Sequence, residues 1–243
     1  MQIEGKVVLV TGSSSGIGES VARAFAAEGA RVVVNSSSSV EAGKAVAASL
    51  PDALYVRGNV ADARDARAIV TQALSHYGRL DVLVNNAGTT VRIPHTDFDA
   101  VTPEVWHRIL DVNVIGTWQV TQAAIPALRE SGDGCIVNVG SLAGLRPSGS
   151  SIPYAASKAA VHHLTLLLAN ALGPTVRVNA VAPGLIDTPW TADWSDLRDA
   201  VKVMAPLQRS GIPDDVATLC LGLVRSDYVT GQVVACDGGL SLR

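Results

Sequence analysis

The 243-residue sequence predicts an α/β fold, a doubly wound parallel sheet of about seven strands with helices on both faces. Short apolar runs alternate with longer amphipathic patterns, and several of these runs are apolar without alternation, which is typical of strands covered on both sides. Gly29, Gly78 and Gly173 close helical patterns, as C-terminal helix caps do. With no composition break or internal repeat, residues 1–243 are expected to form a single domain.

Seven strands are expected in chain order: KVVLVT from Lys6, RVVVN from Arg31, ALYVRG from Ala53, DVLVNN from Asp81, CIVNVG from Cys135, VRVNAVAP from Val176 and GQVVACDG from Gly231. Amphipathic patterns lie between them: GIGESVARAFAAEG from Gly16, DARAIVTQALSHYG from Asp65, the long pattern of residues 103–131, SKAAVHHLTLLLANALG from Ser157 and DDVATLCLGLV from Asp214. This order of strands and helices predicts parallel neighbours joined by helical crossovers.

Composition excludes several classes of partner. The net charge is −3 with the signs interspersed, so neither a nucleic acid nor a membrane surface is expected as a partner. MQIEGKVVLVTG at the amino end has no cationic leader, and its apolar run is too short to span a membrane. The sequence has three cysteines, Cys135, Cys220 and Cys236, and no two of them have metal-ligand spacing. The odd number predicts reduced thiols, and the spacing predicts no metal site. We therefore expect a soluble cytoplasmic protein.

The stretch VVLVTGSSSGIGESVARAFAAEG predicts an anion-binding turn between the first strand and the first helix. Gly12, Gly16 and Gly18 have the spacing G-x-x-x-G-x-G, and glycine lets the backbone approach a pyrophosphate. The free N–H groups at the start of the next helix would complete the site. A tight turn without ligand could carry the same glycines, but its position in the chain favours a Rossmann-type dinucleotide site.

Tyr154 and Lys158 stand four residues apart in an alanine-rich helical pattern and therefore share one helix face. A free phenol has a pKa of about 10, and a nearby ammonium favours the phenolate. Such a tyrosine could exchange a proton with an alcohol or carbonyl oxygen. The alternative is a half-buried aromatic ring beside a lysine that extends to solvent.

Two polar residues could complete this site. Ser141 follows the expected strand CIVNVG, at the edge of the sheet where open α/β folds bind ligands, although a loop serine can also cap local backbone. Asn113 interrupts an apolar helical stretch, and a buried amide must be hydrogen-bonded, so it could equally brace a helix against a strand.

Together these features closely match one family. TGSSSGIG from Thr11, NNAG from Asn85, Asn113, Ser141, YAASK from Tyr154 and PGLIDT from Pro183 occur in this order. The chain resembles the short-chain dehydrogenases/reductases, in their short single-domain branch, over nearly its whole length. The family is one of oxidoreductases that transfer a hydride between a nicotinamide cofactor and a carbonyl or alcohol carbon.

The resemblance implies roles for individual residues. Tyr154 would be the general acid/base, Lys158 would lower its pKa and hold the nicotinamide ribose, Ser141 would orient the substrate oxygen, and Asn113 would hold a water in a relay to Lys158. NNAG would brace the sheet beside the adenosine. Asn59 stands where the family usually has an aspartate at the adenine. The implied cofactor contacts are Gly12, Ser14, Ser15, Gly16, Ile17, Gly18, Asn35, Ser36, Ser37, Asn59, Val60, Asn86, Ala87, Gly88, Tyr154, Lys158, Pro183, Gly184, Ile186 and Thr188.

The segment within about 185–211 lacks a clear periodicity and, by the resemblance, forms a lid over the substrate. Trp190 and Trp194 would add an aromatic wall beside Ser141, Leu142 and Tyr154, or would pack the lid on the body. Few charges are expected in this pocket, which favours an uncharged carbonyl or secondary alcohol. Further candidate wall residues are Leu145, Ile152 and Val91, while His162 and His163 are expected at a packing or subunit face.

The serine run after the second strand bears on the cofactor. No acidic residue stands between the end of this strand and Glu41, so nothing there would repel a 2′-phosphate, and NADP is expected over NAD. The usual cation is missing from the run, and Arg57 is expected to point elsewhere.

Two rival functions remain open. A 3-oxoacyl-thioester reductase would need a basic patch for its acyl carrier protein, for which Arg129 and Arg146 are the candidates. A nucleotide-sensing binding protein would keep the fold and lose the chemistry, against which the complete set of Asn113, Ser141, Tyr154 and Lys158 argues. A homotetramer, or a dimer, is expected from the resemblance, and the low charged fraction of 17% fits extra subunit contacts.

Overall fold

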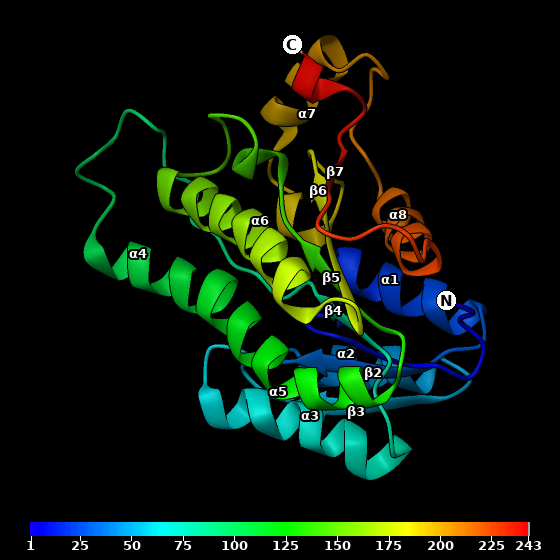
Figure 1. Ribbon diagram of the computed structural model, residues 1–243. Helices are drawn as coiled ribbons and strands as arrows, with labels where there is room; N and C mark the ends of the chain where they lie inside the picture. The colour runs from blue at the N-terminus through cyan, green and yellow to red at the C-terminus, as the bar shows by residue number, and fades with distance from the viewer. Residues whose placement is uncertain (243) are drawn as a thin grey trace.

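The computed structural model, which describes residues 1–242, contains seven parallel strands in one sheet of order β3-β2-β1-β4-β5-β6-β7 (Figure 1). Each strand overlaps the run expected for it, so the predicted fold class is confirmed. The strands are β1 Val7–Val10, β2 Arg31–Ser36, β3 Ala53–Arg57, β4 Val82–Asn85, β5 Gly134–Val139, β6 Val176–Pro183 and β7 Val233–Cys236.

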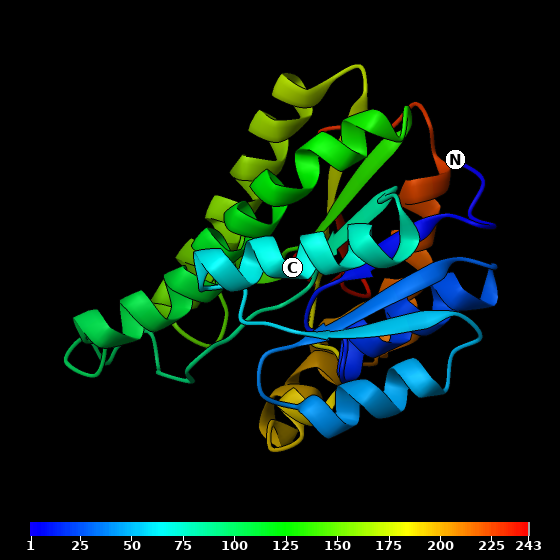
Figure 2. The same ribbon diagram turned by 90° about the horizontal axis from the view of Figure 1, so that it is seen from below.

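Helices cover both faces of this sheet (Figures 1 and 2). One layer consists of α1 (Gly16–Ala27), α2 (Val40–Ala48) and α8 (Pro213–Arg225). The opposite layer consists of α3 (Ala63–Tyr77), α5 (Thr117–Glu130) and α6 (Ile152–Leu172), and α4 (Pro103–Leu110) runs through the π-helical turn η1 (Asp111–Gly116) directly into α5. Short elements complete the chain: η2 (Leu142–Gly144), η3 (Pro189–Thr191), α7 (Ser195–Met204) and η4 (Leu240–Leu242).

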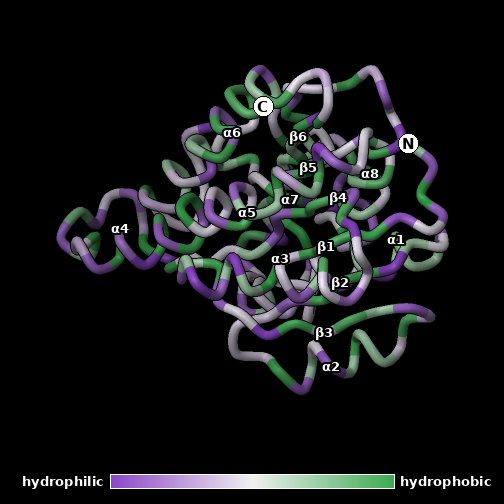
Figure 3. Tube along the Cα trace, turned by 60° about the horizontal axis from the view of Figure 1, so that its bottom comes forward, coloured by the Kyte–Doolittle hydropathy of each residue, from purple (hydrophilic) through white to green (hydrophobic). Residues whose placement is uncertain are grey.

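The apolar strands explain the two layers. Successive side chains of a strand point to opposite faces, and in β1 Val8 and Val10 pack with α1 and α8 while Val7 and Leu9 pack with α3 and α5. All four are fully buried. In Figure 3 hydrophobic stretches gather in the middle of the molecule, and hydrophilic ones are more frequent at its periphery. Strand β1 is apolar at every position because each of its two faces lies in a hydrophobic core.

Three local expectations differ from the structure. The nine-residue helix α2 follows the serine run, where no helix was expected, and α7 forms within the segment expected to be irregular. Gly78 is the left-handed cap predicted for it, with φ 73°, but Gly173 is extended with φ −61° and ψ 148°. Pro174 explains this, because the residue before a proline is driven towards the extended region.

The sheet order reverses between β1 and β4, and this point positions the site. β1 pairs with β2 on one side and with β4 on the other, and all the pairings are parallel. The carboxyl ends of the strands therefore share one edge, with a crevice where the crossovers diverge. Within residues 1–242, no helix combines the length and the apolar character that a bilayer crossing requires.

Candidate active site

A cleft of about 710 Å³ lies at the carboxyl ends of the strands. All residues predicted to contact the cofactor line it, from the glycine loop after β1 to Thr188 after β6. Ser141, Leu142, Trp190 and Trp194 line it too, and Asn113 is the predicted site residue that lies behind its surface. The structure therefore brings segments from the whole length of the chain into one continuous cavity.

The glycine loop is packed so closely that side chains would not fit. A Cβ on Gly12, whose φ is +63°, would lie 2.8 Å from Cα of Ala87, and one on Gly18 would lie 2.4 Å from the Gly12 oxygen. Nδ2 of Asn86 donates to the carbonyl oxygens of Thr11 and Gly12, both at 2.9 Å, and holds the loop open towards the cleft. Because α1 begins here at Gly16 and its N-terminal N–H groups face the loop, the loop fits the pyrophosphate of a dinucleotide.

The serine run is shaped by buried hydrogen bonds. Nδ2 of Asn35 donates to the carbonyl oxygens of Val56 and Gly58, both at 3.1 Å. The hydroxyl of Ser36 contacts the Ser39 carbonyl oxygen at 3.0 Å and the Tyr55 hydroxyl at 2.9 Å. Both side chains are therefore engaged within the protein, although both residues line the cleft.

Arg57 lies beside the serine run, although it is not among the residues that line the cleft. Its position at the end of β3 is paired in register with Ser36, and its Nε donates to the carbonyl oxygen of Ser37 at 3.2 Å. The adjacent strands β2 and β3 bring together residues 20 apart in sequence. A guanidinium therefore stands beside the exposed residues Ser37 and Ser38.

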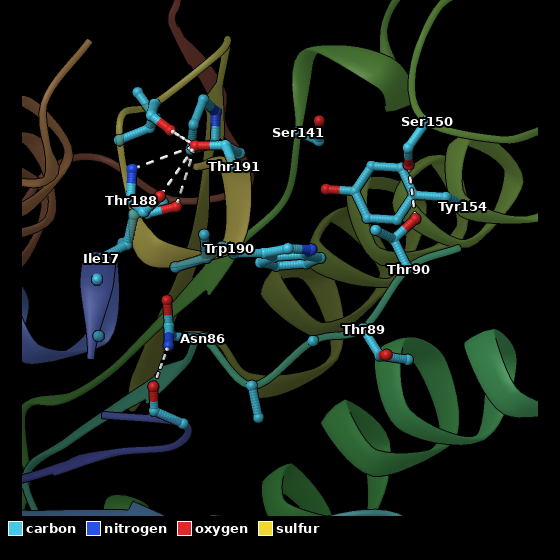
Figure 4. Close-up of a pocket in the computed structure, with 18 of the residues that line it drawn as sticks. Ile17, Asn86, Thr89, Thr90, Ser141, Ser150, Tyr154, Thr188, Trp190 and Thr191 are labelled. Carbon is cyan, nitrogen blue, oxygen red and sulfur yellow. Dashed lines mark hydrogen bonds between the residues drawn. The ribbon is translucent and has the colours of Figure 1, made fainter. Parts of the chain in front are cut away.

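Tyr154 and Ser141 come from neighbouring segments that meet in the cleft. Ser151 caps α6 by accepting the Tyr154 N–H at 3.4 Å, which places Tyr154 in the first turn. Figure 4 shows the phenol oxygen pointing towards Ser141. Burial raises the pKa of Tyr154, and the Ser141 hydroxyl acts in the opposite direction by hydrogen bonding.

Lys158 is 4% exposed, and its Nζ donates to the Val139 carbonyl oxygen at 2.8 Å. The ammonium lies 5.8 Å from the centre of the Tyr154 ring. Burial lowers the pKa of Lys158 to about 8. The sequence predicted a lowered phenol pKa, whereas in this structure burial outweighs other influences and the pKa of Tyr154 is raised.

Asn113 lies in the π-helical turn η1, and its side chain is hydrogen-bonded to two neighbouring segments. Its Oδ1 accepts the Thr89 N–H at 2.8 Å, and its Nδ2 donates to the Thr89 carbonyl oxygen at 3.0 Å and to the Ser157 hydroxyl at 2.9 Å. These contacts tie the loop after β4 to α6, as the bracing interpretation expects. The role in a water relay stays a prediction.

Aromatic side chains from the lid cover the other side of the cleft. The Trp190 ring lies edge-on to Tyr154, with centroids 6.4 Å apart (Figure 4). The guanidinium of Arg92 lies 5.8 Å from the centre of the Trp194 ring and also donates to the Asp196 carboxylate, which links α7 to the loop after β4. Both tryptophans therefore line the cleft and pack the lid on the body at the same time.

Other expectations for the walls were incomplete. Leu145, Ile152 and Val91 do not line the cleft, so their proposed part in its wall is wrong. Sequence reasoning missed lining residues that have no motif: Thr89, Thr90 and Ser150 on facing loops, Leu197 and Val201 on α7, and Leu240 near the carboxyl end. The hydroxyls of Thr90 and Ser150 are hydrogen-bonded to each other (Figure 4).

The two arginines considered for an acyl carrier protein lie apart. Arg129 is in the last turn of α5, just before β5 begins, and so lies at the edge of the sheet opposite the cleft. Arg146 belongs to the loop after β5 on the cleft side, where it is exposed and donates to the Ser241 carbonyl oxygen. They do not form one basic patch.

Comparison with known proteins gives consistent matches over the full length. The family model described as enoyl-(acyl carrier protein) reductase matches residues 12–241. A Streptomyces violaceoruber protein bearing the name ketoacyl reductase 2 of the granaticin polyketide synthase is 60% identical over 242 residues, covering 98% of this chain and 97% of that protein.

Two solved structures have nearly the same fold. A short-chain dehydrogenase/reductase from Burkholderia xenovorans superposes with a TM-score of 0.92 at 40% identity, covering 98% of this chain and 99% of the other. The 3-ketoacyl-(acyl-carrier-protein) reductase from Brucella melitensis, complexed with NADH, has a TM-score of 0.91 at 36% identity, with coverage of 98% and 99%.

Proposed function

The chain belongs to the short-chain dehydrogenase/reductase family and is an NAD(P)-dependent oxidoreductase acting on carbonyl and alcohol groups, and from this premise we propose that it reduces an uncharged ketone of a ketoacyl substrate with NADPH. The observation that carries the proposal is that the hydroxyls of Ser141 and Tyr154 face each other in the cleft. The Trp190 ring lies edge-on to Tyr154. The similarity to ketoacyl reductases supports the acyl nature of the substrate.

In the proposed reaction, the bound nicotinamide cofactor supplies the hydride. The Tyr154 hydroxyl donates its proton to the ketone oxygen as negative charge develops there, and in the reverse direction it accepts that proton. The Ser141 hydroxyl donates a hydrogen bond to the same oxygen. The Lys158 ammonium, with a pKa of about 8, is largely charged at neutral pH and favours this oxyanion from within a buried site.

The acid/base role predicts that Tyr154→Phe lowers turnover by roughly 10²–10⁴, the usual contribution of positioned acid–base catalysis. Only a hydroxyl is removed, so folding and cofactor affinity should stay near those of the wild type. The measurement is loss of reduced-cofactor absorbance with a panel of ketoacyl thioesters and cyclic ketones. Tyr228→Phe is the matched control, because Tyr228 is fully exposed.

Three results would contradict the proposal in whole or in part. Wild-type turnover by Tyr154→Phe would remove the acid/base role. Binding of NADPH without turnover of any ketone or alcohol in the panel would instead favour the nucleotide-sensing alternative. Turnover of simple cyclic ketones but of no ketoacyl thioester would refute the ketoacyl assignment while leaving the carbonyl reductase intact.

The preference for NADPH is supported by Arg57 and by the serine run. Ser37 and Ser38 are exposed beside the guanidinium, and no acidic residue lies between Ser36 and Val40. A 2′-phosphate placed there would meet a cation and hydroxyl donors and no repelling carboxylate. Ser36 is less suitable for a test of this preference, because its hydroxyl is bonded to Tyr55.

The proposed setting is the cytoplasm, with the chain assembled as a homotetramer or a dimer. Cys135 and Cys220 are free and buried and Cys236 is free, which suits a reducing compartment. Ile115 and Trp118, with exposed fractions of 44% and 40%, and Leu166 and Leu167, with 44% and 56%, support self-association through the α5 and α6 layer.

A further inference from the structure

His162 is a buried titratable side chain that the proposed reaction does not use. It lies on α6 one turn after Lys158 and is 6% exposed, whereas its neighbour His163 is exposed. Its Nε2 accepts the backbone N–H of Ser141 at 3.4 Å. The imidazole therefore touches the backbone of the residue whose hydroxyl faces the reaction centre, without itself lining the cleft.

The loop that carries Ser141 is wrapped around this ring. A Cβ on Gly140 would lie 2.1 Å from Nε2 of His162, and one on Gly144 would lie 2.7 Å from its Cε1. The ring thus occupies the space left by the two glycines that flank Ser141 and η2. A residue with a Cβ does not fit at Gly140 because the imidazole fills that space, and at Gly144 the imidazole and the α6 backbone at Lys158 both exclude one.

The other hydrogen bonds of the loop do not involve the Ser141 N–H, so the position of Ser141 depends on the His162 ring. The Ser141 Oγ accepts the Ala143 N–H at 3.2 Å, and the Gly140 N–H is held by the Val181 carbonyl oxygen at 2.7 Å. Within residues 1–242, the His162 ring is the acceptor of the Ser141 N–H. The imidazole must present an unprotonated Nε2 to accept this bond, so the proton of the neutral ring sits on Nδ1.

We propose that His162 is a positioning residue for catalysis: its neutral imidazole fixes the Gly140–Gly144 loop and thereby aims the Ser141 hydroxyl at the substrate oxygen. The inference rests on the proposed function, since it acts through Ser141. It assigns a task to a side chain that the sequence suggested for packing or a subunit face. It also explains why glycine occurs on both sides of Ser141.

The test compares two substitutions of similar size. His162→Gln keeps an acceptor near the position of Nε2, whereas His162→Met fills the same space without one. We expect His162→Met to lower kcat/KM by about tenfold, because misplacement of a reacting group by about 1 Å can cost up to about 100-fold. His162→Gln should stay within about threefold of the wild type, and the NADPH dissociation constant should change less than about twofold in both.

The decisive measurement is a double-mutant cycle with Ser141→Ala. If His162 acts through Ser141, adding His162→Met to Ser141→Ala should change kcat/KM by less than about twofold. An unreduced tenfold effect in that background would overturn the positioning role and leave a structural one, as would equal losses in the Gln and Met variants. His163→Met is the control for substitution at an exposed histidine of the same helix.

The experiments distinguish failure of the proposed function from failure of the positioning role. Unchanged turnover in Tyr154→Phe and Ser141→Ala would overturn the proposed function, and the positioning role with it. Losses in those two variants, together with normal turnover in His162→Met, would overturn the positioning role alone. If His162→Met does not fold, His162→Asn replaces it, because an Asn amide stops short of the Nε2 position and should lose activity as Met does.

Discussion

Burial governs the protonation of the residues nearest the reaction centre. It raises the pKa of the Tyr154 phenol, lowers that of Lys158 to about 8 and lowers that of His162 to about 4. For His162 the positive charge of Lys158 acts in the same direction, while the Gly144 carbonyl opposes it. At the residue scale, then, the site favours neutral side chains around one buried ammonium.

The His162 pKa predicts a dependence of stability on pH. The folded value of about 4 lies below the ordinary 6.5, so between these values the unfolded chain binds a proton that the folded protein does not. The contribution is fully present above pH 6.5 and is lost as the pH falls towards about 4, by at most about 1.4 kcal/mol per pH unit.

Urea unfolding at about pH 7 and about pH 5, at fixed protein concentration, would measure this dependence. The free energy of unfolding should fall less in His162→Gln than in the wild type, because glutamine does not titrate. Carboxylates contribute to both proteins and cancel in the difference. Equal slopes in the two proteins would contradict the prediction, and His163→Gln should retain the wild-type slope.

Arg57 provides the second prediction at this scale. Arg57→Gln should weaken NADPH binding by about tenfold, the lower end of the loss expected for a charge-assisted hydrogen bond, and should change NADH binding by less than about twofold. Fluorescence titration of each reduced cofactor gives the two dissociation constants. Arg64→Gln is the control, since Arg64 is 88% exposed and pairs with Asp62. Equal losses for both cofactors would exclude a 2′-phosphate contact.

At the scale of elements, the lid is more ordered than its sequence indicates. α7 packs over the cleft through Leu197 and Val201, and Arg92 links it to the loop after β4. Leu197 and Val201 are four residues apart, so they share the side of α7 that faces the cleft. η1 is a second element whose form the sequence did not indicate. Its π-helical turn places Asn113 in hydrogen-bonding contact with Thr89 and Ser157.

The lid predicts a change in hydrogen exchange. Amides of residues 195–204 should exchange more slowly when cofactor and a substrate alcohol are both bound, because these ligands fill the space beneath α7. In the free protein, Arg92→Met should speed this exchange by about threefold, since an exposed ion pair and a cation–π contact each contribute less than about 1 kcal/mol.

Lys202→Met is the matched control for that experiment. Lys202 pairs with Asp199 within α7 and so does not connect the lid to the body. Exchange mass spectrometry with peptide resolution is sufficient. Equal protection with and without ligands would argue against a closing lid, and equal acceleration by both variants would show that Arg92 stabilises only the helix.

At the scale of the whole molecule, the apolar face on α5 and α6 predicts self-association. Trp118→Glu together with Leu167→Glu should shift the protein towards monomers in light scattering coupled to size-exclusion chromatography, because each places a charge on a surface proposed to be buried. Tyr228→Glu, at a fully exposed position distant in sequence from that face, should leave the assembly unchanged. A monomeric wild type would refute the prediction.

Much of this molecule could be predicted from sequence because its signals are local. Apolar strands without alternation, the glycine spacing after β1 and the four-residue step from Tyr154 to Lys158 each reflect the geometry of one element or one turn. These patterns yielded all seven strands and the sheet's parallel character and, together with the family resemblance, more than half of the residues that line the cleft. They required no knowledge of which segments meet.

Tertiary structure alone decided the features that depend on juxtaposition. Arg57 reaches Ser37 only because β2 and β3 are neighbours. Leu240 lies in the cleft because the Leu207 N–H binds the Gly238 carbonyl oxygen. His162 lies beneath Ser141 because α6 packs on the loop after β5. The phenol pKa also depends on burial, which outweighs the opposing hydrogen bond of Ser141. The physical reason is common to all of them: desolvation and long-range contacts are properties of the packed chain, whereas periodicity and glycine spacing are properties of a segment.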